Sequence, residues 1–223
     1  MRLVVVDASA VGGGPVTRAV ECAASEARRC GVEVTTVRLY SIFTSCCAAC
    51  GDCRPTSRCA RRHRAIEEAS VLLSGAEVLL VGVCSSASQR DPRAEALLRR
   101  LVGSFAGVYD SRHGEGDRDA AAVRKRAGLV SSAHPLLSIA ALLGVLPYGL
   151  AGVWRVLDRA GVEVVGTASV ARRWSGPAAW DLTRERALRL GRLLAMRPDG
   201  RPALRPLPDG GRILHAPARP RVA

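Results

Sequence analysis

The chain has 223 residues, of which 48% are apolar and 4% aromatic, and this composition excludes a fully disordered protein. A chain of this length suits one domain, with or without a tail. Lysine and arginine number 33 against 20 acidic residues, so the net charge of +13 should attract anions such as phosphorylated cofactors or acidic partners. No block of eight residues is uniformly basic, and the arginines of residues 54–64 have no aromatic residues among them, which argues against nucleic-acid binding.

Residues 3–6 form an apolar run that stops at Asp7, too early for the hydrophobic region of a signal peptide. The long uncharged stretch at residues 135–154 carries glycine and proline in its middle, so it predicts two buried helices rather than a membrane span. The chain holds eight cysteines, and without a signal peptide we expect it in a reducing cytoplasm. Clustered cysteines there bind metal more often than they form disulfides.

The first 39 residues predict a strand, a glycine-rich turn, a helix and a second strand. Residues 3–6 are aliphatic and mostly β-branched, which is typical of a buried strand. Apolar residues at helical spacing predict a helix over residues 16–30, and Gly31 stands where that helix should end. Residues 32–39 predict the second strand, and a strand–helix–strand unit implies a parallel sheet.

The same alternation continues along the chain. Further helices are predicted over residues 61–74, 92–102, 136–160 (in one broken piece or two) and 181–195, with Asp181 as the N-cap of the last. Further strands are predicted over residues 77–83, 127–130 and 162–166, so residues 1–196 predict a three-layer, doubly wound α/β domain on a five-stranded parallel sheet. Residues 197–223, rich in proline and arginine, predict a flexible tail or a strap across the surface.

Ligands of doubly wound folds bind beyond the carboxyl ends of the strands, so the loop after the first strand is a candidate phosphate site. Residues 9–17 lead into a helix N-terminus, where free backbone N–H groups favour an anion. Ser9 and Thr17 add hydroxyl donors, Arg18 adds a charge, and three glycines let the backbone approach closely: Gly12, Gly13 and Gly14. The loop matches neither the Walker A nor the dinucleotide-binding fingerprint, and a turn that only reverses the chain is the alternative.

Four cysteines form the most specific motif in the chain, with the spacing C-x2-C-x2-C-x5-C: Cys47, Cys50, Cys53 and Cys59. Three thiolates at intervals of three can converge on one face of a small loop, and ferredoxin-type clusters open with the same spacing. Zinc sites usually pair two cysteine knuckles that lie further apart. The spacing therefore favours a [4Fe–4S] cluster over zinc, with a loop of free thiols as the third alternative.

With these motifs the sequence resembles the flavodoxin-like NADPH-dependent FMN reductases, and most of all their iron–sulfur flavoprotein branch. The resemblance spans roughly residues 1–195 and rests on residues 4–9, the tripeptide Thr17-Arg18-Ala19, the cysteine motif, residues 76–82 and residues 161–166. It implies a flavodoxin-like fold, bound FMN, electrons from NAD(P)H or ferredoxin, and a homodimer or tetramer. It also implies that the four cysteines of the motif carry a [4Fe–4S] cluster.

The resemblance implies FMN contacts in three loops. The phosphate would lie on Ser9, the three glycines and Thr17, and the ribityl chain and ring along residues after the third and fourth strands: Ser85, Ser86 and Ser132. Cys84 is a candidate redox thiol and His134 a candidate partner of the flavin or its substrate, with a small buried residue and a polar rim residue as the plainer interpretations. The family pattern has an aromatic residue after the third strand, and residues 84–88 of this chain contain none.

The leading hypothesis is an FMN-dependent NAD(P)H oxidoreductase or electron-transfer flavoprotein with a [4Fe–4S] relay. Its electron acceptor would be a small molecule or a protein, with no nucleic acid and no membrane involved. No side chain is assigned a catalytic role, because a flavin itself carries the hydride and the electrons. The alternative is a non-enzymatic, diverged flavodoxin-like protein that binds metal or a partner and has lost FMN.

Overall fold

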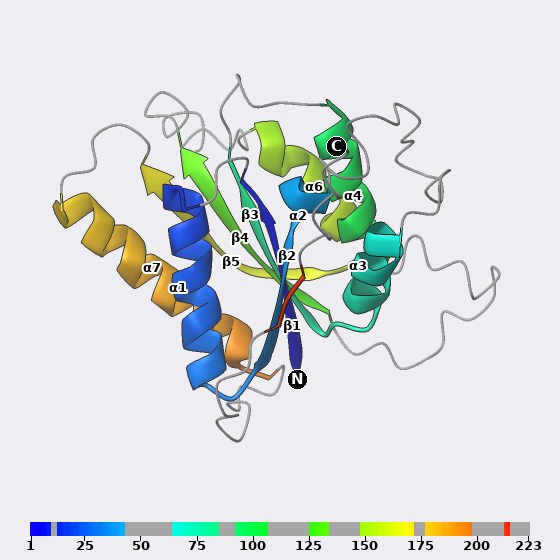
Figure 1. The fold of residues 1–223 in the computed structure, drawn as a ribbon. Helices are drawn as coiled ribbons and strands as arrows, with labels where there is room; N and C mark the ends of the chain where they lie inside the picture. The colour runs from blue at the N-terminus through cyan, green and yellow to red at the C-terminus, as the bar shows by residue number, and fades with distance from the viewer. Residues whose placement is uncertain are drawn as a thin grey trace, which may run out of the picture.

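A six-stranded, all-parallel β-sheet forms the middle of the molecule (Figure 1). The computed structural model describes residues 1–9, 13–42, 64–84, 92–106, 125–133, 148–171, 177–197 and 212–214. The strands lie in the order β5-β4-β3-β1-β2-β6, with these bounds: β1 Arg2–Ala8, β2 Glu33–Arg38, β3 Val78–Val83, β4 Arg126–Ala133, β5 Glu163–Ala171 and β6 Arg212–Leu214. The first five strands have the order of a flavodoxin-like sheet, which confirms the predicted fold class.

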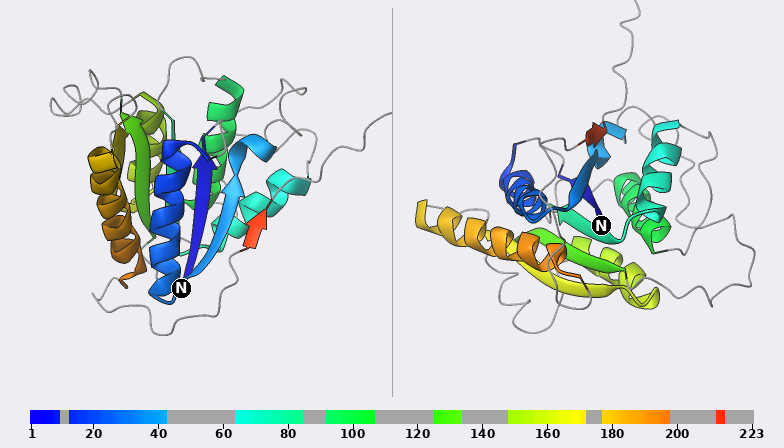
Figure 2. Two further views of the ribbon diagram at one scale, coloured as in Figure 1. Left: turned by 60° about the vertical axis from the view of Figure 1, so that its left-hand side comes forward. Right: turned by 90° about the horizontal axis from the view of Figure 1, so that it is seen from below.

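Helices cover both faces of the sheet and complete the three layers (Figure 2). Helices α1 and α7 lie on one face, and α3, α4 and α6 lie on the other. Their bounds are α1 Pro15–Arg29, α2 Leu39–Ile42, α3 Arg64–Ser74, α4 Pro92–Phe105, α6 Tyr148–Arg159 and α7 Pro177–Ala195. Within the described part of the chain, no helix is both long enough and apolar enough to cross a membrane.

Each face of the sheet has its own apolar core. Along β1, Val4 and Val6 belong to the core under α3, α4 and α6, whereas Leu3 and Val5 belong to the core under α1 and α7. This alternation follows from the two-residue period of a strand. Because both faces are covered, β1 is a continuous apolar run rather than an alternating one, which is why its sequence predicts a buried strand.

The turn that ends α1 forms where glycine predicts it. Gly31 N donates to Arg28 O at 2.9 Å, and Val32 N donates to Ala27 O at 3.1 Å. These two bonds satisfy carbonyl groups that have no partner inside the helix. The same pair of bonds ends α6 at Gly161, and β2 and β5 each begin one residue after the predicted start.

Four predicted boundaries are wrong by three or more of the described residues. Strand β4 ends at Ala133 instead of residue 130, and α4 ends at Phe105 instead of residue 102. Helix α7 begins at Pro177, so Asp181 lies inside the helix and does not cap it. A proline is well placed at the start of a helix because its missing N–H would have no partner there. Strand β5 runs on to Ala171 instead of ending at Gly166, because Ala168 and Val170 continue to alternate into the core.

The predicted sheet of five strands gains a sixth from the C-terminal region. Strand β6 pairs in parallel with β2, with Arg212 opposite Thr35 and Leu214 opposite Val37, and it forms one edge of the sheet (Figure 2). Three residues are too few to produce a periodic sequence signal. Without β6, strand β2 would have an unpaired edge. Backbone hydrogen bonds to that edge hold the short β6 segment in the sheet.

Candidate functional site

The polar residues at the carboxyl end of β1 lie near the middle of the sheet. In the register of the sheet, Asp7 pairs with Arg38 of β2 on one side and with Gly82 of β3 on the other. The chain passes from β1 to β2 in one direction, and β3 lies in the opposite direction, so this is the topological switch point of the sheet. Ligands of doubly wound folds bind at such a point.

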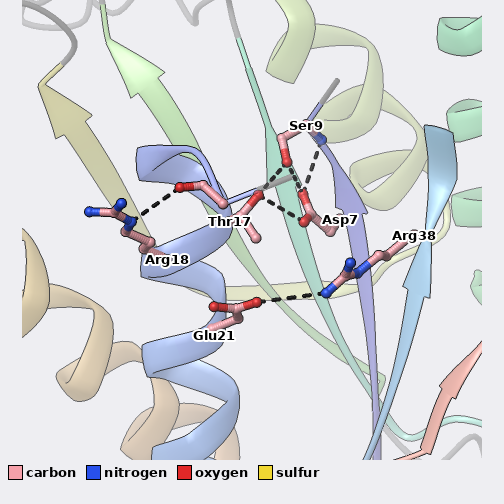
Figure 3. A network of polar contacts seen from close by, with 7 residues as sticks. Asp7, Ser9, Thr17, Arg18, Glu21 and Arg38 are labelled. Carbon is pink, nitrogen blue, oxygen red and sulfur yellow. Dashed lines mark hydrogen bonds and ion pairs between the residues drawn. The ribbon is translucent and has the colours of Figure 1, made fainter. Parts of the chain in front are cut away.

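A network of hydrogen bonds joins Asp7, Ser9 and Thr17 (Figure 3). Asp7 Oδ1 accepts from the backbone N of Ser9 at 3.0 Å and from Ser9 Oγ at 2.5 Å. Asp7 Oδ2 accepts from Thr17 Oγ1 at 3.0 Å, and the two hydroxyl oxygens lie 2.6 Å apart. The network therefore ties the end of β1 to the first turn of α1.

The three residues of this network differ in burial. Asp7 is 6% exposed and Thr17 is 2% exposed, whereas Ser9 is only half-buried. A buried carboxyl group is costly unless it is hydrogen-bonded, and the two hydroxyl groups and one backbone N–H supply its partners. Ser9 is thus the member of the network that solvent, or a ligand, can reach.

The amino end of α1 is open to an anion. Gly14 stands at the N-cap without any side-chain capping bond, Pro15 begins the helix, and its first turn holds no acidic residue. Gly13 has a φ of +78°, a conformation that favours glycine, and a Cβ built on it would meet nothing within 4 Å. The helix dipole and the N–H groups of the first turn favour a negative group at this position.

Two arginines flank the site from different sides (Figure 3). Arg18 Nε donates to Gly13 O at 3.1 Å, which holds the exposed guanidinium beside the turn. Arg38 Nη2 lies 3.9 Å from Glu21 Oε1, and these side chains are 39% and 61% exposed. Solvent screens such a pair, so its contribution to stability is small and Arg38 is free to turn toward a ligand.

Gly82 allows α1 to lie close to the sheet below the site. A Cβ at Gly82 would lie 2.5 Å from Val20 Cγ2 and 3.3 Å from Val16 Cγ1, both on α1. Only a residue without a side chain therefore fits between β3 and the helix. The position of the first turn of α1 relative to Asp7 depends on this contact.

The ends of β3 and β4 bring two further predicted site residues together. Ser132 Oγ donates to Cys84 Sγ at 3.4 Å; Ser132 is buried and Cys84 is half-buried. The register pairs Ala8 with Val83 and Val83 with Ser131, so Cys84 just after β3 and Ser132 near the end of β4 lie at the level at which Ser9 follows β1. The strand ends before the three loops that the sequence singles out therefore lie at one edge of the sheet.

The structure brings six of the predicted site residues to this edge of the sheet: Ser9, Gly13, Gly14, Thr17, Cys84 and Ser132. The other predicted site residues lie outside the described part of the chain: Gly12, Ser85, Ser86, His134, Cys47, Cys50, Cys53 and Cys59. Among the residues that are described, no group of three or more histidine, cysteine, aspartate or glutamate side chains could hold a metal ion. The metal motif thus stays a prediction.

Cys22 and Cys30 belong to the packing of α1 rather than to the site. Both pack as partly buried residues against the core under α1 and α7. Burial raises the pKa of each thiol above its usual value, with a further increase from the nearby carboxylate of Glu21 for Cys22 and of Glu26 for Cys30. A raised pKa leaves less of the reactive thiolate, which suits a structural role in the packing of α1.

Asp7 is the site residue that the sequence analysis does not identify. Its sequence signal is an acidic residue directly after four buried aliphatic residues and two positions before a serine. A charged residue that continues an apolar strand is buried only if it has partners. The partner Thr17 lies ten residues away, so the tertiary structure is needed to reveal the pairing.

Solved structures with a similar fold include several reductases. An NAD(P)H:quinone oxidoreductase from Methanothermobacter marburgensis superposes with a TM-score of 0.60 at 15% identity, covering 86% of this chain and 98% of that chain. An azoreductase from Bacillus anthracis superposes with a TM-score of 0.57 at 10% identity, covering 86% of this chain and 98% of that chain. The apo form of an NADH:FMN oxidoreductase superposes with a TM-score of 0.53 at 14% identity, covering 90% of this chain and 94% of that chain. No protein-family model matches the sequence, and no curated protein matches it.

At these identities the comparisons show the fold alone. The chain covers nearly the whole length of each of these neighbours, so the similarity extends over a complete doubly wound domain. The flavodoxin-like architecture that the sequence predicts is confirmed, both by this similarity and by the strand order.

Proposed function

We propose that this protein is a flavin-dependent oxidoreductase that takes electrons from NAD(P)H and passes them to a small-molecule or protein acceptor. The observation that carries the proposal is the amino end of α1, which has no side-chain cap and lies beside the half-buried residue Ser9 at the switch point of a flavodoxin-like sheet. The names of structural neighbours, a quinone oxidoreductase, an azoreductase and an NADH:FMN oxidoreductase, support the same class of chemistry.

The residues present fit the phosphate of FMN at the amino end of α1. Among the described residues, no atom lies within 4 Å of a Cβ built on Gly13, no side chain caps the helix, and no acidic residue occupies its first turn. Ser9 Oγ can donate from the strand side, and Arg18 adds a positive charge beside the turn. The carboxyl group of Asp7 is an unfavourable neighbour among the described residues, and it is buried and hydrogen-bonded to Ser9 and Thr17.

The flavin ring would lie toward the ends of β3 and β4. There Cys84 and Ser132 offer a thiol and a hydroxyl that are already hydrogen-bonded to each other. Ser85, Ser86 and His134 stay predicted contacts of the ribityl chain and the ring. Bound FMN supplies hydride and electron transfer, so these side chains need only orient the ring and adjust its potential.

The cysteine motif supports a second redox centre as a finer part of the proposal. Cys47, Cys50, Cys53 and Cys59 have the spacing of a [4Fe–4S] ligand set, with zinc or free thiols as the alternatives. A homodimer or tetramer is proposed on the resemblance alone, and a cytoplasmic location on the clustered cysteines and the short N-terminal apolar run. These parts are tested separately from the flavin, because a flavin site at β1 does not depend on a metal loop.

The test is an anaerobic purification followed by assays of released flavin, iron and zinc on one sample. The flavin-free fraction is then titrated with FMN, and NADH and NADPH oxidation is measured with a quinone acceptor. Stoichiometric FMN binding and FMN-dependent oxidation of either nicotinamide would support the proposal. A protein that binds no FMN and oxidises neither nicotinamide would favour the non-enzymatic alternative instead.

A further inference from the structure

Helix α7 has a stripe of apolar and arginine residues on its outer side. The stripe follows the spacing of four and three residues that brings side chains to one face of a helix, and it consists of Leu182, Arg186, Arg189, Leu193 and, just after the helix, Met196. Leu182 is 50% exposed and Met196 is 40% exposed, both arginines are exposed, and Leu193 is half-buried. The opposite side of the helix is buried in the core that it shares with α1. We call this outer surface the α7 stripe.

The two arginines of the α7 stripe are not neutralised by the rest of the described chain. Arg192, which lies on the same helix toward α1, has its Nε 3.4 Å from Glu26 Oε1, and Arg29 shares that carboxylate at 3.3 Å. Among the described residues, no such ion pair forms with Arg186 or Arg189. Their guanidinium groups are therefore available to carboxylates of another molecule.

The apolar residues of the α7 stripe indicate a protein partner. Leu182 and Met196 are two of the three large apolar residues that are exposed in the described part of the chain. Arginine and methionine are enriched at protein–protein interfaces, where lysine is depleted. An interface over the stripe would bury both apolar side chains and pair the arginines between them.

The acidic residues of α7 favour a protein over a nucleic acid. Asp181 and Glu185 are exposed on the same helix as the stripe. The continuous phosphate backbone of a nucleic acid would meet these carboxylates with like charge. An acidic protein can instead place single carboxylates against the planar forks of Arg186 and Arg189, and an apolar group against Leu182.

The α7 stripe starts near the edge of the sheet on which the flavin would lie. Strand β5 ends at Ala171, opposite Ala133 of β4, and α7 follows it in the chain (Figure 1). At the other end of the helix, Leu193 O accepts from Nη2 of Arg126 at the start of β4, at 3.1 Å. The 19 residues of α7, about 28 Å long, thus run along the whole height of the sheet. A protein docked on the stripe would therefore reach the edge that holds Ser132.

We infer that the α7 stripe is the docking surface for an acidic one-electron carrier protein, which accepts the electrons that the site takes from NAD(P)H. This rests on the proposed function, because it specifies the protein acceptor of that site. The hydride of one NAD(P)H supplies two electrons, which reduce two carrier molecules, and one proton is released to solvent. The arginines steer the carrier by charge, and Leu182 and Met196 add apolar contact once it is docked.

The test uses the soluble haem domain of cytochrome b5, an acidic one-electron acceptor, with the FMN-loaded protein. Its reduction by NAD(P)H is compared with that of a quinone and of cytochrome c, a basic one-electron acceptor. Arg186→Glu/Arg189→Glu should lower kcat/KM for cytochrome b5 about tenfold or more, because like charges then meet at the interface. The rate with the quinone should stay unchanged, and the rate with cytochrome c should not fall. Calorimetric titration with oxidised cytochrome b5, without NAD(P)H, should show a rise in Kd by a similar factor.

Arg155→Glu/Arg159→Glu on α6 is the matched control. Both arginines are exposed, the change in net charge is the same, and α6 lies on the opposite face of the sheet from α7. This variant should keep the wild-type kcat/KM and Kd for cytochrome b5. Leu182→Ser tests the apolar contact and should weaken binding at every salt concentration, whereas the effect of the α7 arginines should shrink as salt rises. Thermal unfolding midpoints verify that each variant is folded.

The outcomes distinguish this inference from the proposed function. A wild-type protein that oxidises no NAD(P)H with the quinone overturns the proposed function and this inference with it. Activity with the quinone but no binding or reduction of cytochrome b5 overturns the inference alone, and so do equal losses in the α6 and α7 variants. If the α7 variant instead loses binding of a short DNA duplex and keeps that of cytochrome b5, the stripe is a nucleic-acid surface, and the inference is likewise overturned.

Discussion

Thr17 on α1 donates a hydrogen bond to Asp7 on β1 across 3.0 Å, and both residues are buried. The bond joins the last buried residues of the first strand to the first turn of the following helix. Between them runs the turn that the sequence marks as a phosphate site. The buried contact thus holds the two described ends of that turn together.

Replacing Thr17 with valine should lower the stability of the protein. Valine fills a similar volume but leaves Asp7 Oδ2 without this donor, so the free energy of unfolding should fall by about 1–3 kcal/mol. Urea denaturation measures this change, and Thr17→Ser should recover most of the loss. Equal stability of the valine variant and the wild type would mean that the hydrogen bond to Asp7 adds nothing to folding.

Gly13→Asp should expel FMN from the flavin site. Gly13 has a φ of +78°, and the space around it is open, so a carboxylate there would face the phosphate with like charge. Gly13→Asn is the matched control, because asparagine has a similar shape, tolerates positive φ and carries no charge. We expect the aspartate variant to lose stoichiometric flavin in a released-flavin assay, and the asparagine variant to keep most of it. Full retention of flavin by Gly13→Asp would place the phosphate elsewhere.

Gly82→Ala should displace α1 and destabilise the domain. The added Cβ would lie 2.5 Å from Val20 Cγ2, so either the valine or the helix must move. Overpacking of this kind costs about 1–3 kcal/mol, which a shift in the midpoint of thermal or urea unfolding would report. Gly75→Ala is the control: its Cβ would meet its nearest neighbours at 3.6 Å, an ordinary contact. A Gly82→Ala variant as stable as the Gly75→Ala variant would contradict the close packing of α1.

Lys125, the one lysine of the chain, should stabilise the fold by bonding to the ends of two helices. Its Nζ donates to Ser74 O at the end of α3 and to Phe105 O at the end of α4, and it lies 5.0 Å from the centroid of the Phe105 ring. Lys125→Met keeps much of the apolar stem and removes these donors, so unfolding should become easier by about 1–3 kcal/mol. Arg64→Met removes one side of a surface ion pair with Glu68 and should leave the unfolding midpoint nearly unchanged. Equal effects of the two substitutions would argue against a capping role for Lys125.

Cys50→Ser should abolish the broad absorbance near about 400 nm that a cysteine-ligated iron–sulfur cluster would give. The serine removes one thiolate of the proposed ligand set and leaves the flavodoxin-like domain intact, so flavin binding should persist. Cys22→Ser, on α1 and outside the motif, is the control and should keep both the absorbance and the iron content. An unchanged spectrum and iron content in Cys50→Ser would reject this ligand set.

Much of the fold follows from local sequence signals. The aliphatic runs form β1 and β3, and glycines end α1 and α6. Both follow from the local preferences of these residues for buried strands and for helix ends. The start of α7 and the length of β5 are less local. A proline can begin a helix as well as an aspartate can cap one, and the small residues of β5 become strand residues only because α7 covers them.

The candidate site, too, depends partly on local sequence signals and partly on tertiary contacts. The sequence by itself places Ser9, the glycine turn and Thr17 between a buried strand and a helix N-terminus, because a strand–turn–helix unit always directs that turn to the carboxyl edge of a parallel sheet. Only the tertiary structure decided that Thr17 turns inward to Asp7 and that Cys84 meets Ser132, residues 48 positions apart. Side-chain direction and long-range pairing depend on how closely α1 packs on the sheet and on which strands are neighbours. Both are properties of the assembled layers and not of any one segment.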